Sequence, residues 1–119
     1  MLIFNHPLLE NEKFHKIDSI DDISKTPSNS IVRFIFSKDN IQIIKFCQKN
    51  SVMCAIDVES ITDALLASSL DASYLIVSEE NAPNIQKVAE TYLFDAKIIV
   101  TSKDIEKYAL LGIDGIIFN

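Results

Sequence analysis

The sequence predicts an α/β domain built on a parallel sheet of about five strands. The clearest strand is Tyr74–Ser78, four consecutive apolar residues followed by a polar one, a pattern typical of a strand buried on both faces. Similar apolar segments recur about every 20 residues, a spacing that fits a strand followed by a short crossover helix. These segments begin at Ile31, Val52, Tyr74, Lys97 and Ile113.

The chain has 119 residues, a length that favours one domain able to bury its own core. Apolar residues make up 48% of the chain and charged residues 24%, values that are ordinary for globular proteins and unlike those of disordered chains. We therefore expect a single α/β domain over residues 1–119. Within it, residues 1–30 should pack on a sheet formed by residues 31–119.

The net charge is −6, and no cluster of lysines and arginines could displace the counterions of a phosphate backbone, so we expect no nucleic-acid partner. No apolar run reaches the roughly 18 residues of a membrane span, so we expect no membrane partner. The first residues lack a basic leader and a long apolar region, which favours a cytoplasmic protein. Cys47 and Cys54 lie in apolar patterns without CxxC spacing, and we interpret both as reduced core residues.

Residues 1–30 carry the weakest patterns in the chain. Leu2–Phe4 and Phe14–Ile17 fit two short strands separated by a polar segment. Ser19 precedes an acidic residue by three positions, which is a helix-capping arrangement. A short helix is therefore expected from Ser19 to about Lys25.

From residue 31 onward, strands and helices alternate. Ile31–Phe36 is rich in β-branched and aromatic residues, as strands are. The helix expected from about residue 40 to residue 49 places Ile41, Ile44 and Cys47 on one stripe for packing on a sheet. The remaining expected elements are strand 52–57, helix 60–70, strand 74–78, a helix opened by Pro83, strand 97–100, a helix after Asp104 that Gly112 closes, and strand 113–118.

Two arrangements of these elements remain open, and Tyr74–Ser78 is central in both. The preferred arrangement is a three-layer αβα, flavodoxin-like sandwich with helices on both faces of the sheet. The alternative is a half-(βα)-barrel, in which the strands follow chain order and the helices cover one face. Residues 111–118 look like the helix-to-strand joints of (βα)-barrel proteins, a similarity of packing.

Polar residues at the carboxyl ends of the strands form the candidate site, because open parallel sheets bind ligands beyond those ends. Asp57 is the most prominent, since it ends an apolar strand and lies beside Glu59. If this candidate site is enzymatic, Asp57 and Glu79 would act as its general acid and base. The candidate ligand-binding residues are Lys38, Asp57, Glu59, Ser78, Glu79, Thr101 and Lys103.

Asp57, Ser78, Thr101 and Lys103 resemble the acid, hydroxyl and lysine set of response-regulator receiver domains. The resemblance implies a phosphoacceptor role for Asp57. Receivers also carry an acidic pair after their first strand, where this chain has Ser-Lys-Asp, and a lysine where its last strand ends in Phe-Asn. We therefore favour the simpler interpretation that Asp57 ends a strand or caps the following helix.

The chain has only two glycines, Gly112 and Gly115, and neither opens a helix. This excludes the glycine-rich phosphate loops of dinucleotide and P-loop enzymes. His6 and His15 have no partners at metal-ligand spacing. We therefore expect no cofactor and no metal.

Because no strong catalytic pattern is present, the favoured function is a non-catalytic protein-interaction or regulatory module. The alternative is a small-molecule-binding or enzymatic site at the carboxyl ends of the strands. The expected partner is another protein or a second copy of the chain. A homodimer is indicated by helix 60–70, whose apolar residues extend beyond one stripe, and by strand 113–118, which either residues 1–30 or a second subunit must cover.

Overall fold

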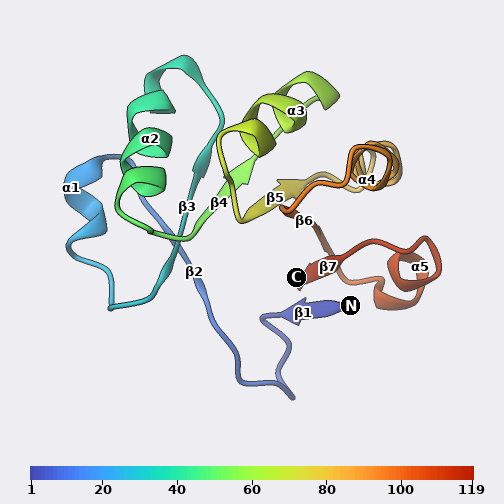
Figure 1. Ribbon diagram of the computed structural model, residues 1–119. Coiled ribbons are helices and arrows are strands. Elements are labelled where there is room, and N and C mark those ends of the chain that lie inside the picture. The colour runs from blue at the N-terminus through green and yellow to red at the C-terminus, as the bar shows by residue number, and fades with distance from the viewer.

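The computed structural model describes all residues from 1 to 119 and contains seven strands, five α-helices and one 3-10 helix (Figure 1). None of the helices combines the length and apolar character needed to cross a bilayer. The elements are β1 (Leu2–Phe4), β2 (Phe14–Lys16), α1 (Ile20–Ile23), β3 (Ile31–Ile35), η1 (Lys38–Asn40), α2 (Ile41–Lys49), β4 (Cys54–Asp57), α3 (Ile61–Ser69), β5 (Tyr74–Val77), α4 (Ala82–Thr91), β6 (Lys97–Ser102), α5 (Ile105–Leu110) and β7 (Gly115–Phe118).

The strands form one sheet in the order β1-β7-β6-β5-β4-β3-β2, and every neighbouring pair is parallel. The sheet curls into a half-barrel with the α-helices on its outer side, and the two chain ends belong to the neighbouring strands β1 and β7 (Figure 1). The predicted α/β class and parallel sheet are confirmed, with β5 as the middle strand. The sheet has seven strands instead of five, because β1 and β2 of the N-terminal segment join its two edges.

The strand order is that of the alternative half-barrel, so the preferred flavodoxin-like sandwich is not formed. After β2, each crossover leads to the adjacent strand, so successive helices are placed on the same face. The concave face must then be covered without helices. Curling solves this, because it brings strands from distant parts of the sheet to face one another.

The two faces of the sheet therefore bury two separate cores. The outer core holds 23 buried residues from the strands and the helices that cover them, including both cysteines. The inner core is made only by strand residues, and the ring centroids of Phe4, Phe14 and Tyr74 lie 4.8 to 5.9 Å apart within it. Its six buried residues are Phe4, Ile31, Ala55, Ile76, Ile99 and Ile117.

Residues 1–30 of the same chain cover the last strand. β1 pairs with β7 in parallel register, with Leu2 opposite Gly115 and Phe4 opposite Ile117. The two strands approach so closely that a Cβ atom on Gly115 would lie 3.0 Å from the carbonyl oxygen of Leu2. Of the two coverings expected from the sequence, the first is thus correct, and β7 needs no second subunit.

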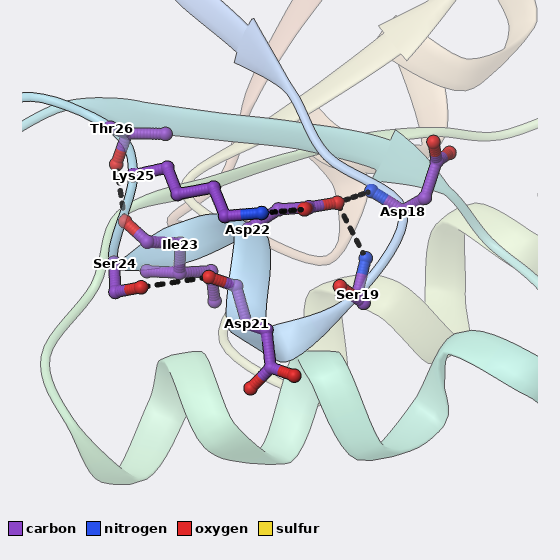
Figure 2. Close-up of polar contacts among 8 residues, drawn as sticks. All are labelled: Asp18, Ser19, Asp21, Asp22, Ile23, Ser24, Lys25 and Thr26. Atoms are coloured by element: carbon purple, nitrogen blue, oxygen red, sulfur yellow. Dashed lines mark hydrogen bonds and ion pairs between the residues drawn. The ribbon is translucent and has the colours of Figure 1, made fainter.

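The four-residue helix α1 is held by its first turn. Asp22 Oδ2 accepts hydrogen bonds from the backbone N–H groups of Asp18 at 3.0 Å and Ser19 at 3.2 Å (Figure 2). The Asp18 bond lowers the pKa of the Asp22 carboxyl below its ordinary value of 3.8, and the Ser19 bond and the charge of Lys25 act in the same direction. The sequence prediction of a capped helix after Ser19 is confirmed.

Helices α2 to α5 all end in the same way. In each, the backbone N–H two positions after the C-cap donates to a carbonyl five residues earlier, at 2.9 to 3.2 Å, as in a Schellman motif. The residue just after each C-cap takes a left-handed conformation, in which glycine is the preferred residue. These residues are Ser51 (φ 56°), Asp71 (φ 66°), Leu93 (φ 53°) and Gly112 (φ 73°), and only the glycine was predicted.

Candidate functional site

At the carboxyl end of the half-barrel, Asp57 of β4 is bound by Arg33 of β3. Arg33 donates from Nε to Oδ1 at 2.9 Å and from Nη2 to Oδ2 at 3.2 Å, a two-point ion pair. The side chains are 19% and 29% exposed, so the pair is partly desolvated. Asp57 therefore neither caps the following helix nor stands free as a phosphoacceptor would.

The Arg33–Asp57 pair borders a small cavity of about 160 Å³ where β2, β3 and β4 end. Lys16 pairs with Arg33 in the parallel register of β2 and β3, so both side chains lie on the concave side of the sheet. Ile35 also faces this cavity and is 57% exposed. The polar lining residues are Lys16, Asp18, Arg33, Asn40 and Asp57.

The structure does not gather the other predicted site residues around Asp57. Asp57 lies directly opposite Ile76 of the neighbouring strand β5. Ser78 follows Ile76 by two residues, so the polar ends of β4 and β5 are staggered along the strand direction. Ser78 Oγ accepts a hydrogen bond from the backbone N–H of Asn81 at 3.3 Å. The backbone carbonyl of Glu59 accepts a hydrogen bond from Nδ2 of Asn81 at 3.1 Å. Both bonds hold the turn that precedes α4. The candidates that do not border the cavity beside Asp57 are Lys38, Glu59, Ser78, Glu79, Thr101 and Lys103.

Sequence reasoning missed Arg33, although its sequence context contained a signal. Arg33 is the one charged residue in the apolar run Ile31–Phe36, and it has the same strand parity as Ile31, which is fully buried. A charge on that face needs a partner because an unpaired buried charge is unstable. Asp57 supplies that partner from the same face of the next strand, two residues beyond Ala55, which lies directly opposite Arg33.

The amino end of the half-barrel, where the strands begin, has a different character. An open hollow of about 670 Å³ lies there between the ends of α3 and α4, bordered by Leu65, Tyr92 and Leu93. A second hollow of about 660 Å³ lies beside it at the starts of β1 and β7. Lys97, the first residue of β6, borders both hollows.

Several large apolar side chains that line these two hollows, or directly neighbour a lining residue in the chain, are exposed, although such side chains are usually buried. Their exposed fractions run from 37% to 90%, and they come from α3, from the end of α5, from the joints before β6 and β7, and from β1. We call them the amino-end surface. Its residues are Leu2, Leu65, Leu66, Tyr92, Leu93, Leu110 and Leu111.

The expectation that helix 60–70 exposes apolar residues is confirmed. Ile61, Leu65 and Leu66 of α3 are 42%, 37% and 50% exposed, while the small residues Ala64 and Ala67 face the core. This helix has one buried side made of alanines and an outer side of larger residues. The arrangement suits a helix that packs closely on the sheet and contacts something else outside.

No protein-family model matches this chain, and no curated protein sequence matches it. No group of three or more His, Cys, Asp or Glu side chains is placed so that it could hold a metal ion.

Proposed function

We propose that this protein is a protein-interaction module that associates with a second copy of itself through the amino-end surface. The observation that carries the proposal is the conformation of Leu93, which projects an 84% exposed leucine from a left-handed backbone position. A bulky residue costs roughly 1–2 kcal/mol in that conformation. The equivalent positions after α2, α3 and α5 are serine, aspartate and glycine.

Leu93 therefore opposes folding through backbone strain, and its exposed side chain contributes almost no hydrophobic free energy in return. Strain of this kind is concentrated at functional sites, where the side chain is used for binding. Leu93 borders the larger hollow together with Tyr92 and Leu65, so a partner that fills this hollow would bury all three. Burial would add the hydrophobic free energy that these exposed side chains do not contribute in the monomer.

A second copy of the chain is the partner that the surface fits best. A twofold interface needs a surface that complements itself. Around the hollow, the acidic residues Asp71 and Asp95 lie on the same rim as Lys97, so each copy can offer both signs of charge to the other. A standard interface covers about 800 Å² on each partner, roughly a tenth of the 7345 Å² exposed by this chain.

Sedimentation velocity over a range of protein concentrations tests this proposal. We expect the wild-type chain to form dimers at micromolar concentration and Leu93→Glu to remain monomeric, because a carboxylate buried in the apolar interface would be desolvated. Leu66→Glu should weaken the dimer in the same way.

Leu8→Glu is the matched control, since Leu8 is 85% exposed and borders none of the five best-defined cavities. It should dimerise like the wild type. A wild-type chain that stays monomeric at about 100 μM, a concentration at which contacts of even modest affinity form, would overturn the proposal. Dimerisation that Leu93→Glu leaves unchanged would overturn it too.

A further inference from the structure

We propose that the small cavity at the carboxyl end binds a small zwitterionic amino acid, with its carboxylate at Lys16 and Arg33 and its ammonium group at Asp18. This site lies at the opposite end of the half-barrel from the amino-end surface and is independent of dimerisation. Lys16 and Arg33 are direct partners in the β2–β3 register, and like charges so placed repel each other.

Only one of these two cations is neutralised inside the chain. Asp57 uses both carboxylate oxygens on Nε and Nη2 of Arg33, which leaves Nη1 of the guanidinium for another acceptor. No salt bridge involves Lys16. A carboxylate placed between Lys16 Nζ and Arg33 Nη1 would supply the missing negative charge with charge-assisted hydrogen bonds.

The opposite charge is also available in the cavity. The backbone N–H of Asp18 is fixed by its bond to Asp22, and Figure 2 shows the Asp18 carboxylate directed away from that cluster with no contact of its own. Asn40 donates from Nδ2 to the Ile35 carbonyl at 2.7 Å, so its Oδ1 remains an acceptor. The Asp18 carboxylate and the Oδ1 atom of Asn40 together favour an ammonium group as the ligand's cation.

The lining thus combines two cations, Lys16 and Arg33, with two anions, Asp18 and Asp57. A simple anion would meet both carboxylates and a simple cation would meet both basic groups, whereas a zwitterion satisfies each side. The size favours a small ligand, because about 160 Å³ is well below the roughly 300–1,000 Å³ of most ligand pockets. The ligand class is therefore an amino acid of the smallest kind, and the exposed Ile35 favours an apolar side chain such as that of alanine.

Isothermal titration of the wild-type chain with L-alanine, acetate and ethylamine tests the proposal. L-alanine should bind, while acetate and ethylamine, which each carry half of its charges, should bind at least about tenfold more weakly. Lys16→Gln and Asp18→Asn should each raise the dissociation constant for L-alanine by about tenfold or more, since each removes one charge-assisted contact.

Lys13→Gln and Asp21→Asn are matched controls, because they make the same changes at neighbouring residues outside this cavity. Both should bind L-alanine like the wild type. Circular dichroism melting of every variant would show that it is folded. The proposal is overturned if L-alanine produces no binding heat up to about 10 mM, if acetate binds as tightly as L-alanine, or if the Lys16 and Asp18 variants bind unchanged.

Discussion

The two ends of the half-barrel satisfy their exposed side chains in opposite ways. At the carboxyl end, the central charged groups pair within the chain: Arg33 holds Asp57, and Asp22 holds the first turn of α1. At the amino end, large apolar side chains such as Leu93 and Leu110 are 84% and 90% exposed. The Arg33–Asp57 pair is thus complete in a single copy, whereas under our proposal the amino-end surface is buried by a second copy.

This difference teaches where each kind of interaction contributes on a curled parallel sheet. At the carboxyl ends of β3 and β4, the alternation of the strands places Arg33 and Asp57 on the concave face, where they pair. The amino ends follow the C-termini of helices, where the Schellman turns expose whatever residue takes the left-handed position. Where that residue is Leu93, the turn exposes a large apolar side chain.

The largest expected effect at the carboxyl end comes from breaking its central ion pair. Exposed pairs contribute at most about 1 kcal/mol and loss of one partner of a buried pair costs about 3–5 kcal/mol. The partly buried Arg33–Asp57 pair lies between these limits, so Arg33→Ala should lower the free energy of unfolding by about 2–3 kcal/mol. Urea unfolding followed by circular dichroism measures this change.

The double variant Arg33→Met with Asp57→Leu should lose less than the sum of the two single losses, because no charge is left unpaired. Lys25→Ala removes the exposed contact to Asp22, in which Lys25 is 77% exposed, and should change stability by no more than about 0.5 kcal/mol. Equal losses in Arg33→Ala and Lys25→Ala would contradict the distinction between the two pairs.

A smaller loss of stability is expected from changing Gly115, at the start of β7 where this strand pairs with β1. A Cβ atom on Gly115 would lie 2.6 Å from Ile99 Cδ1 and 3.0 Å from the Leu2 carbonyl oxygen. The isoleucine side chain can move, but the backbone of β1 must shift. Gly115→Val should therefore cost about 1–3 kcal/mol, and Gly115→Ala less. If urea unfolding shows no loss in either variant, β1 does not pack against β7 as described.

The smallest expected effect is the pH dependence of α1. Because the folded chain lowers the pKa of Asp22, its contribution to stability is complete above the ordinary value of 3.8 and is lost as pH falls through the lower folded pKa. The difference in melting temperature between wild type and Asp22→Asn should be constant near neutral pH and shrink below pH 3.8. A difference that grows on acidification would contradict this sign.

Local patterns in the sequence predicted most elements, but not their arrangement. Tyr74–Val77 and Leu2–Phe4 were correctly predicted as strands, yet nothing near Leu2 indicates that its partner is Gly115, more than a hundred residues away. Pairing of edge strands depends on the closure of the whole sheet. The preferred sandwich failed for this reason, since repeated βα units are compatible with helices on one face or on both.

The candidate site was predicted only in part. Asp57 borders a cavity, as expected for a strand end, but the stagger of the curled sheet separates it from Ser78, and its actual partner is Arg33. The conformation of Leu93 could not be predicted, because a leucine after a helix gives no sign of a left-handed backbone. Such features arise from tertiary packing that overrides local preference.

The dimer dissociation constant of Leu93→Gly, measured by sedimentation velocity against the wild type, tests the central claim most directly. Glycine relieves the left-handed strain, so the dilute monomer should be more stable by about 1 kcal/mol. The same change removes the side chain at the centre of the amino-end surface, so the dissociation constant should rise by about tenfold or more. A Leu93→Gly chain that dimerises as tightly as the wild type would contradict the account.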